Sequence, residues 1–345
     1  MKKQILFTLL GSWIVLFSQA QTVNYKVLKD DPNDLPLQLS LDPFYAEMSG
    51  GSARLGWGLR VTALFRKIVV FNFDIRKAYL DVEGRQHVNG SLMSPGTDGL
   101  KKQTVIEGGG ALTFSDKTKS TYLSVVLSSS TTTSGNYQTT HTKYITVPGS
   151  VRKINGLHLG INQTNLALEF SEGKSGSFTA FNTSNPADFT GFGEYGTTYH
   201  GSDIYDGYTM LNTTSIYAGL AHKRVTNLTV ATDYSRRKKG NRIYYDFYFD
   251  MMYGAVMHFA DITAVDGTTF EVKNSDMKRM GWRFGWMYGG SSKSYFTYKA
   301  EFGSKPGYVG QHKGFLSTRF YLFLSMGWSI PFKAKFLNVP APTTN

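Results

Sequence analysis

Hydrophobic and polar residues alternate along several segments of the chain, most clearly in the ten residues RMGWRFGWMY that begin at Arg279. Large apolar side chains take every second position there: Met280, Trp282, Phe284, Trp286 and Tyr288. Successive side chains of a β-strand point to opposite faces, so one face is aromatic and the other carries glycine and Arg283. A helix would scatter the same aromatics around its surface. The segment is therefore predicted to be a strand with two chemically opposite faces.

The same alternation recurs in two earlier segments, residues 54–63 and 69–76. Their apolar positions are Leu55, Trp57, Leu59, Val61, Ala63, Val69, Phe71, Phe73 and Ile75. An aromatic face suits lipid when the opposite, charged face lines a wet interior, which is the pattern of a transmembrane β-barrel. We therefore predict an all-β protein, a transmembrane antiparallel up-and-down β-barrel.

The candidate strands number about fourteen, within a range of twelve to sixteen. Fourteen is an even number, as bacterial single-chain barrels require. The candidate strands are residues 35–48, 53–65, 68–80, 104–115, 120–129, 143–161, 165–173, 191–203, 212–223, 226–235, 242–259, 278–289, 294–303 and 316–332.

The links between these strands alternate in length, as expected for short periplasmic turns and long outer loops. Short links are predicted at residues 66–67, 116–119, 162–164, 236–241 and 290–293, and long ones at 81–103, 130–142, 174–190, 262–277 and 304–314. Counting from a periplasmic N-terminus puts every long link outside and both termini in the periplasm. Two short links, 49–52 and 224–225, fall on the outer side and depart from the rule.

The first twenty residues have the composition of a secretory signal peptide: Lys2 and Lys3, an apolar run from Ile5 to Phe17, and a small residue at Ala20. The predicted organisation is a signal peptide at 1–20, a periplasmic segment at 21–34, the barrel at 35–332 and a periplasmic tail at 333–345. The sequence has no cysteine, which excludes a lipoprotein anchor, disulfides and thiol chemistry.

The formal net charge is +12. We expect no nucleic-acid partner, because the basic residues are dispersed and no nucleic-acid-binding motif is present. The densest basic run, Arg236 to Lys239, is predicted to be a solvated periplasmic hairpin turn beside anionic lipid headgroups.

Nine ionisable residues fall on the predicted lumen face: Arg54, Arg60, Asp74, Arg76, Asp246, Asp250, Arg283, Lys299 and Glu301. Two interpretations stay open, since such residues either select solutes in a pore or pair across the lumen and stabilise the wall. The predicted lipid-facing aromatics are Trp57, Phe71, Phe73, Phe247, Phe249, Trp282, Phe284, Trp286, Phe296 and Tyr298. These faces lead us to expect that Trp286→Arg impairs folding, whereas Lys299→Gln does not.

No catalytic residue, metal site or cofactor is predicted. The seven histidines show no metal-ligand spacing, and neither a nucleophile elbow nor a phosphate-binding loop appears. We therefore expect a protein that is not an enzyme.

The last predicted strand ends in SMGWSIPF, residues 325–332. It resembles the C-terminal β-signal of outer-membrane proteins, and the resemblance marks four positions: Ser325, Gly327, Ile330 and Phe332. Pro331 and the thirteen residues after Phe332 depart from the usual signal. The glycine- and tyrosine-rich strands are similar to those of outer-membrane barrels of Bacteroidota. The resemblance implies a location in the outer membrane, with its lipids and the barrel-assembly machinery as partners.

The first expected function is an outer-membrane channel, porin-like, for small hydrophilic solutes. The alternative is a non-catalytic barrel that serves as an accessory or scaffold of a secretion, assembly or uptake complex, with other envelope proteins as partners. A third possibility, a soluble secreted β-sandwich, requires the Trp282 face to be buried against a second sheet.

Overall fold

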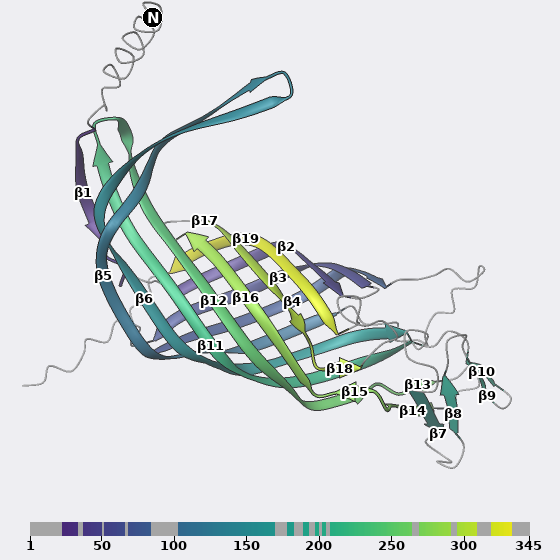
Figure 1. Cartoon of the computed structure of the whole chain (residues 1–345). Coiled ribbons are helices and arrows are strands. Elements are labelled where there is room, and N and C mark those ends of the chain that lie inside the picture. Colours follow the sequence, from purple (N-terminus) through teal and green to yellow (C-terminus); the bar gives the residue numbers. More distant parts are fainter. Residues whose placement is uncertain are drawn as a thin grey trace, which may run out of the picture. The chain divides into compact units, whose positions relative to one another are not determined.

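The computed structural model describes residues 23–33, 37–49, 52–65, 68–83, 103–169, 178–182, 189–192, 197–199, 202–204, 208–263, 269–290, 295–308 and 319–332 (Figure 1). Regular structure in these residues consists of β-strands. No helix among them is long and apolar enough to cross a membrane.

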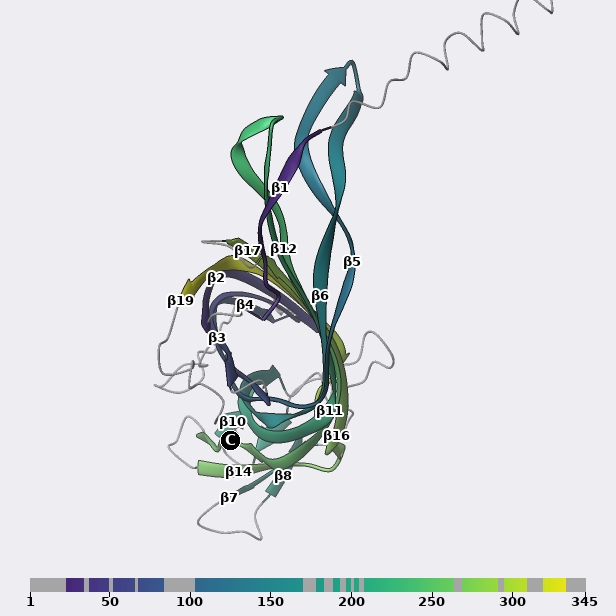
Figure 2. The ribbon, with the colours of Figure 1, turned by 90° about the vertical axis from the view of Figure 1, so that its left-hand side faces the viewer.

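Ten strands form a closed antiparallel ring. They are β2 (Leu37–Ser49), β3 (Ser52–Phe65), β4 (Val69–Glu83), β5 (Thr104–Ser134), β6 (Tyr137–Glu169), β11 (Tyr208–Thr232), β12 (Ser235–Phe259), β16 (Met280–Gly290), β17 (Tyr295–Ser304) and β19 (Phe320–Phe332). Each ring strand pairs with the next ring strand in this order. The last one, β19, closes the ring on β2, where Phe332 pairs with Leu37. Figure 2 shows the strands of the ring around a common axis. The predicted all-β, up-and-down barrel is therefore confirmed.

The number of ring strands among the described residues is lower than the range of twelve to sixteen that we expected. Three predicted links, at 116–119, 162–164 and 224–225, lie inside the continuous strands β5, β6 and β11. The candidate strand 191–203 also lies outside the ring, since it contains parts of the short strands β8 (Phe189–Phe192), β9 (Thr197–Tyr199) and β10 (Ser202–Ile204). These links were predicted as turns because their residues are polar, but polar residues also occur within long strands.

Two predicted links also change character. Residues 130–142, expected as an outer loop, form the ends of β5 and β6 around a turn at Gly135, which has a φ of 58°. The up-and-down order brings the start of β2 and the end of β19 to the same end of the ring. Residues 236–241 are likewise part of β12, and the turn lies at Asp233 and Tyr234.

The long connections at the other end of the ring carry short strands of their own. Strands β7 (Phe178–Asn182), β8, β13 (Ile262–Thr263) and β14 (Thr269–Asn274) form a four-stranded sheet. Strands β9 and β10 pair with each other, as do β15 (Met277–Lys278) and β18 (Gly307–Tyr308).

The chain divides into two compact units. The ring unit contains residues 32–119, 151–226 and 242–345, and the smaller unit contains residues 1–31, 120–150 and 227–241. The predicted periplasmic segment 21–34 contributes β1 (Tyr25–Asp30) to the smaller unit, where it pairs antiparallel with β11. The predicted signal peptide and C-terminal tail lie outside the described residues.

Candidate functional site

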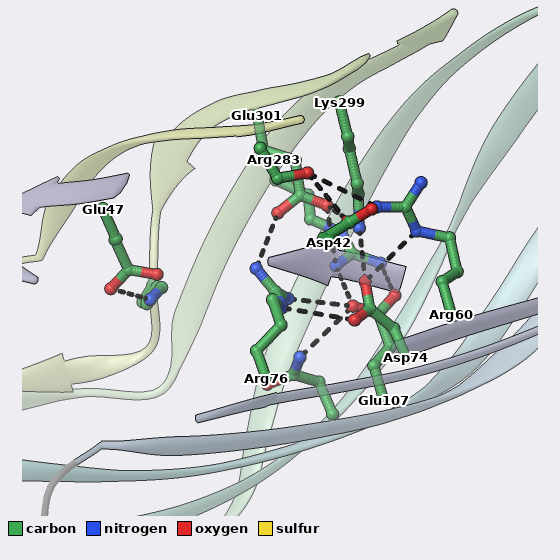
Figure 3. A network of polar contacts seen from close by, with 12 residues as sticks. Asp42, Glu47, Arg60, Asp74, Arg76, Glu107, Arg283, Lys299 and Glu301 are labelled. Atoms are coloured by element: carbon green, nitrogen blue, oxygen red, sulfur yellow. Dashed lines mark hydrogen bonds and ion pairs between the residues drawn. The ribbon is translucent and has the colours of Figure 1, made fainter. Parts of the chain in front are cut away.

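The interior of the ring carries the candidate site, because charged side chains from almost every strand converge there. All nine ionisable residues predicted on the lumen face are buried: Arg54, Arg60, Asp74, Arg76, Asp246, Asp250, Arg283, Lys299 and Glu301. Figure 3 shows the centre of this cluster.

Sequence reasoning missed several members of the cluster, among them Asp42, Glu47, Glu107 and Lys223. Asp42 and Glu47 are five positions apart and would lie on opposite faces of a regular strand. A register shift in β2 between Asp42 and Tyr45 turns both inward. A bulge of this kind adds one residue to a strand and exchanges its faces, so strict alternation assigns the residues beyond the bulge to the wrong face. Glu107 lies two positions after Val105 in β5, so both side chains point inward, while Ile106 between them is exposed. This alternation was present in the sequence.

Arg283 of β16 is the centre of the interior network. Its two terminal nitrogens donate to both carboxylate oxygens of Glu107, at 2.6 and 2.9 Å, and its Nε donates to Asp250 at 2.8 Å. The guanidinium also lies 4.3 Å from the ring centre of Tyr217. A bidentate pair of this geometry is among the strongest charge-assisted contacts in proteins. It links β16 to β5 across the ring interior.

A second part of the network surrounds Lys299. The Lys299 ammonium donates to Asp74 at 3.0 Å and lies 2.8 Å from Glu301, while the Arg76 guanidinium lies 3.6 Å from both Glu301 and Glu107. Figure 3 shows Arg76, Asp74 and Glu107 approaching one another from neighbouring strands.

Asp42 and Glu47 of β2 add further ion pairs to the network. Arg60 pairs with Asp42, which also accepts a hydrogen bond of 3.0 Å from Ser325. Lys305 donates to Glu47 at 2.7 Å. Burial lowers the pKa of the Lys305 ammonium below its usual value, and the neighbouring Glu47 carboxylate opposes that shift.

The charges of this network balance. Within the described residues it contains seven acidic and seven basic side chains: Asp42, Glu47, Asp74, Glu107, Asp246, Asp250 and Glu301 against Arg54, Arg60, Arg76, Lys223, Arg283, Lys299 and Lys305. Asp246 pairs with Lys223 at 3.1 Å. An unpaired buried charge is costly, so a balanced set of paired charges is what a closed interior requires.

His158 is the one histidine inside this network in the described residues. Its Nδ1 lies 2.8 Å from Asp250, and its ring lies 5.1 Å from the rings of both Tyr217 and Tyr248. Among the described residues no group of three or more His, Cys, Asp or Glu side chains is arranged to hold a metal ion.

Little space remains between the interior side chains. Three cavities among them have volumes of about 20 to 30 Å³, and a fourth, beside His158 and Lys223, has a volume of about 10 Å³. One lies beside Arg60, His158 and Lys299, and another beside Arg76, Asn162 and Lys305. A cavity of this size holds one or two water molecules. At these positions the interior side chains of the described residues leave room for water molecules alone.

The outer face of the ring is apolar. Of the ten predicted lipid-facing aromatics, six are exposed, namely Trp57, Phe71, Phe247, Phe249, Phe296 and Tyr298, and four are half-buried, namely Phe73, Trp282, Phe284 and Trp286. The four pack against neighbours on the same face: Trp282, for instance, lies 6.5 Å from Phe249 and 6.0 Å from Phe302 between ring centres. No second sheet covers this face in the described residues, so the β-sandwich alternative is wrong. A charged interior beneath an apolar surface is the polarity of a protein surrounded by lipid.

The four positions of the β-signal resemblance lie on both faces of β19. Ser325 and Gly327 point inward beside Asp42, Ile330 is exposed on the outer face, and β19 ends at Phe332. Their role in assembly stays a prediction.

No protein-family model and no curated protein matches the chain. Two outer-membrane structures are similar to it at low scores. The NanC porin is 7% identical with a TM-score of 0.28, covering 86% of this chain and 100% of its own. OmpT, an outer membrane protein of Vibrio cholerae, is 8% identical with a TM-score of 0.18, covering 89% of this chain and 100% of its own. At these scores the likeness says nothing about what the chain does, and the barrel is established by the strand pairing described above.

Proposed function

We propose that this protein is an outer-membrane β-barrel with a closed lumen that serves as a non-catalytic, membrane-anchored scaffold for an envelope complex. The observation that supports the proposal is the charge-balanced network that fills the ring. A pore for hydrophilic solutes needs an open, water-filled path. The Arg283–Glu107 and Lys299–Asp74 pairs instead cross the place where such a path would run.

The size of the ring supports the same function. Barrels of about eight strands are filled by their own side chains, whereas those of 16 to 18 strands enclose an aqueous channel. A ring of ten strands lies near the filled end of this range, and its inward arginines and tyrosines are large. The scaffold function, expected from the sequence as the alternative, is therefore favoured over the channel.

The test is planar-bilayer conductance of the refolded mature chain, with insertion verified independently by protection of the barrel from protease. We expect inserted protein to give no steady conductance. A variant that removes the central pair, Arg283→Ser with Glu107→Ser, serves as the positive control. Loss of both large side chains opens space and removes one charge of each sign, while Asp250 keeps its contact with His158 and Arg76 keeps Asp74 and Glu301. Steady conductance of the unmodified protein would contradict the closed-lumen scaffold and restore the channel.

A further inference from the structure

Strand β12 begins as an edge strand. It pairs with β11 on one side, but its pairing with β16 on the other side begins only at Ile243, opposite Gly290. Over residues 235–240 no described strand lies against that second edge. Within this segment the Arg237 N–H donates to the Ser235 hydroxyl at 3.2 Å.

This edge is strongly basic. Arg236, Arg237 and Lys238 are exposed, Lys239 is half-buried, and none of the four forms an ion pair within the described part of the chain. The described residues of the smaller unit contain seven basic residues, Lys26, Lys29, Lys143 and 236–239, against three acidic ones, Asp30, Asp31 and Asp233. The unit thus has a net charge of +4 (7 − 3).

The strand is held firmly within its unit. The Asn241 side chain donates to the backbone carbonyl of Ser124 in β5 at 3.0 Å. Leu123, Val147 and Leu228 of the same unit are buried. Gly149 packs so closely that an added Cβ would lie 2.9 Å from Leu123 Cδ1 and 3.4 Å from Leu228 Cδ2. A strand edge that is already ordered loses little entropy when a partner pairs with it.

The charge of the edge selects among partners. Lysine and arginine on an edge strand oppose pairing with a second copy, because like charges would meet. The same charges attract an acidic segment. In strand addition, main-chain hydrogen bonds supply affinity while alternate side chains supply specificity.

We propose that the edge of β12 at residues 235–240 binds an extended, acidic segment of another envelope protein as an additional strand. This inference rests on the proposed scaffold function and names the chemistry of the partner. Arg236 and Lys238 would pair with acidic side chains on one face, and the backbone of Arg237 would bond to the added strand.

The test uses the full mature chain in nanodiscs of neutral phosphatidylcholine and a fluorescent ten-residue peptide of alternating glutamate and valine, with binding followed by anisotropy. We expect saturable binding, weakened about tenfold by Arg236→Glu with Lys238→Glu, since two exposed ion pairs become repulsive. The matched control, Lys117→Glu with Lys119→Glu, reverses two exposed charges on β5 and should bind normally.

A second pair of variants separates strand addition from simple charge attraction. Arg237→Pro removes one backbone N–H of this segment, and proline is tolerated on edge strands. We expect it to weaken peptide binding about tenfold through lost main-chain bonds, whereas Arg237→Thr, which also loses the charge, should weaken it by less than about threefold.

Equal effects of the two Arg237 variants, or unchanged binding by the charge-reversed β12 variant, would overturn the inference. The inference would also be overturned if the acidic peptide did not bind and nanodiscs containing phosphatidylglycerol bound the smaller unit through the same residues. The ligand of the β12 edge would then be a lipid surface. Conductance distinguishes the two proposals: a non-conducting barrel without peptide binding rejects only the acidic partner, and a conducting barrel rejects the scaffold.

Discussion

Single residues show the inverted polarity of the barrel most directly. Trp286 lies on the outer face between Phe247 of β12 and Ala300 of β17. We expect Trp286→Arg to reduce the free energy of unfolding by up to about 2 to 4 kcal/mol if the residue lies near the membrane midplane. Urea unfolding in lipid vesicles measures this loss. Trp286→Phe is the control and should lose much less, because it keeps an apolar ring on the lipid face.

Lys299 shows where an expectation from the sequence must change. Lys299→Gln was expected to spare folding, on the view that the lumen is wet. The structure buries the ammonium between Asp74 and Glu301, so glutamine would leave both carboxylates short of a counter-charge. Breaking a buried pair costs about 3 to 5 kcal/mol.

Lys273 supplies the matched control for Lys299→Gln. It pairs with Glu271 at 3.3 Å in β14, but both side chains are more than half exposed. Lys273→Gln should therefore change the free energy of unfolding by less than about 1 kcal/mol. Equal losses for the two variants in urea unfolding would mean that the Lys299 site is solvated.

Closure of the ring depends on one pair of strands, β19 and β2. Gly327 of β19 sits so close to β2 that a Cβ would lie 2.2 Å from Asp42 Oδ1 and 2.3 Å from the carbonyl oxygen of Leu41. We expect Gly327→Ala to lower the yield of folded barrel, measured as the fraction that resists unfolding in SDS without heating. Gly108→Ala in β5 is the control, since its Cβ would have its nearest neighbour at 3.8 Å. Similar yields for the two variants would show that this close approach is unimportant.

At the scale of the whole molecule, the hairpin of β5 and β6 extends beyond the core of the smaller unit. Residues 129–144 are exposed along both strands, and Ser129 and Thr142 lie opposite each other at 3.4 Å between hydroxyl oxygens. Replacing 129–142 by Asn-Gly therefore keeps the register and supplies a two-residue turn. We expect the free energy of unfolding to change by less than about 0.5 kcal/mol, since no buried contact is lost.

Val125→Asp provides the contrast, because this valine is fully buried in the same unit. Urea unfolding should show a loss of more than about 1 kcal/mol for the buried carboxylate. Strong destabilisation by the shortened hairpin would show that its outer part supports the fold.

The sequence alone determined the faces of the strands. A period of two is a local property, so the alternation around Trp282 and Arg283 predicted an aromatic outside and a charged inside without knowledge of any neighbour. It also assigned Phe332 to the last strand, and Phe332 pairs there with Leu37 of β2. Strand number was less certain, since polar residues such as those at 116–119 look alike in a turn and in the exposed part of a long strand.

Only the tertiary structure decided which of the interior charges pair with one another. Nine of the interior charges could be placed on the inner face from the sequence, which left pairing and solute selection equally open. Their partners depend on register and ring closure, which are not local: Arg283 and Glu107 are 176 residues apart. The bulge in β2 that turns Asp42 and Glu47 inward likewise depends on pairing with β3 and β19. Alternation assigns each side chain to a face, but electrostatic balance across a barrel exists only once the strands are paired.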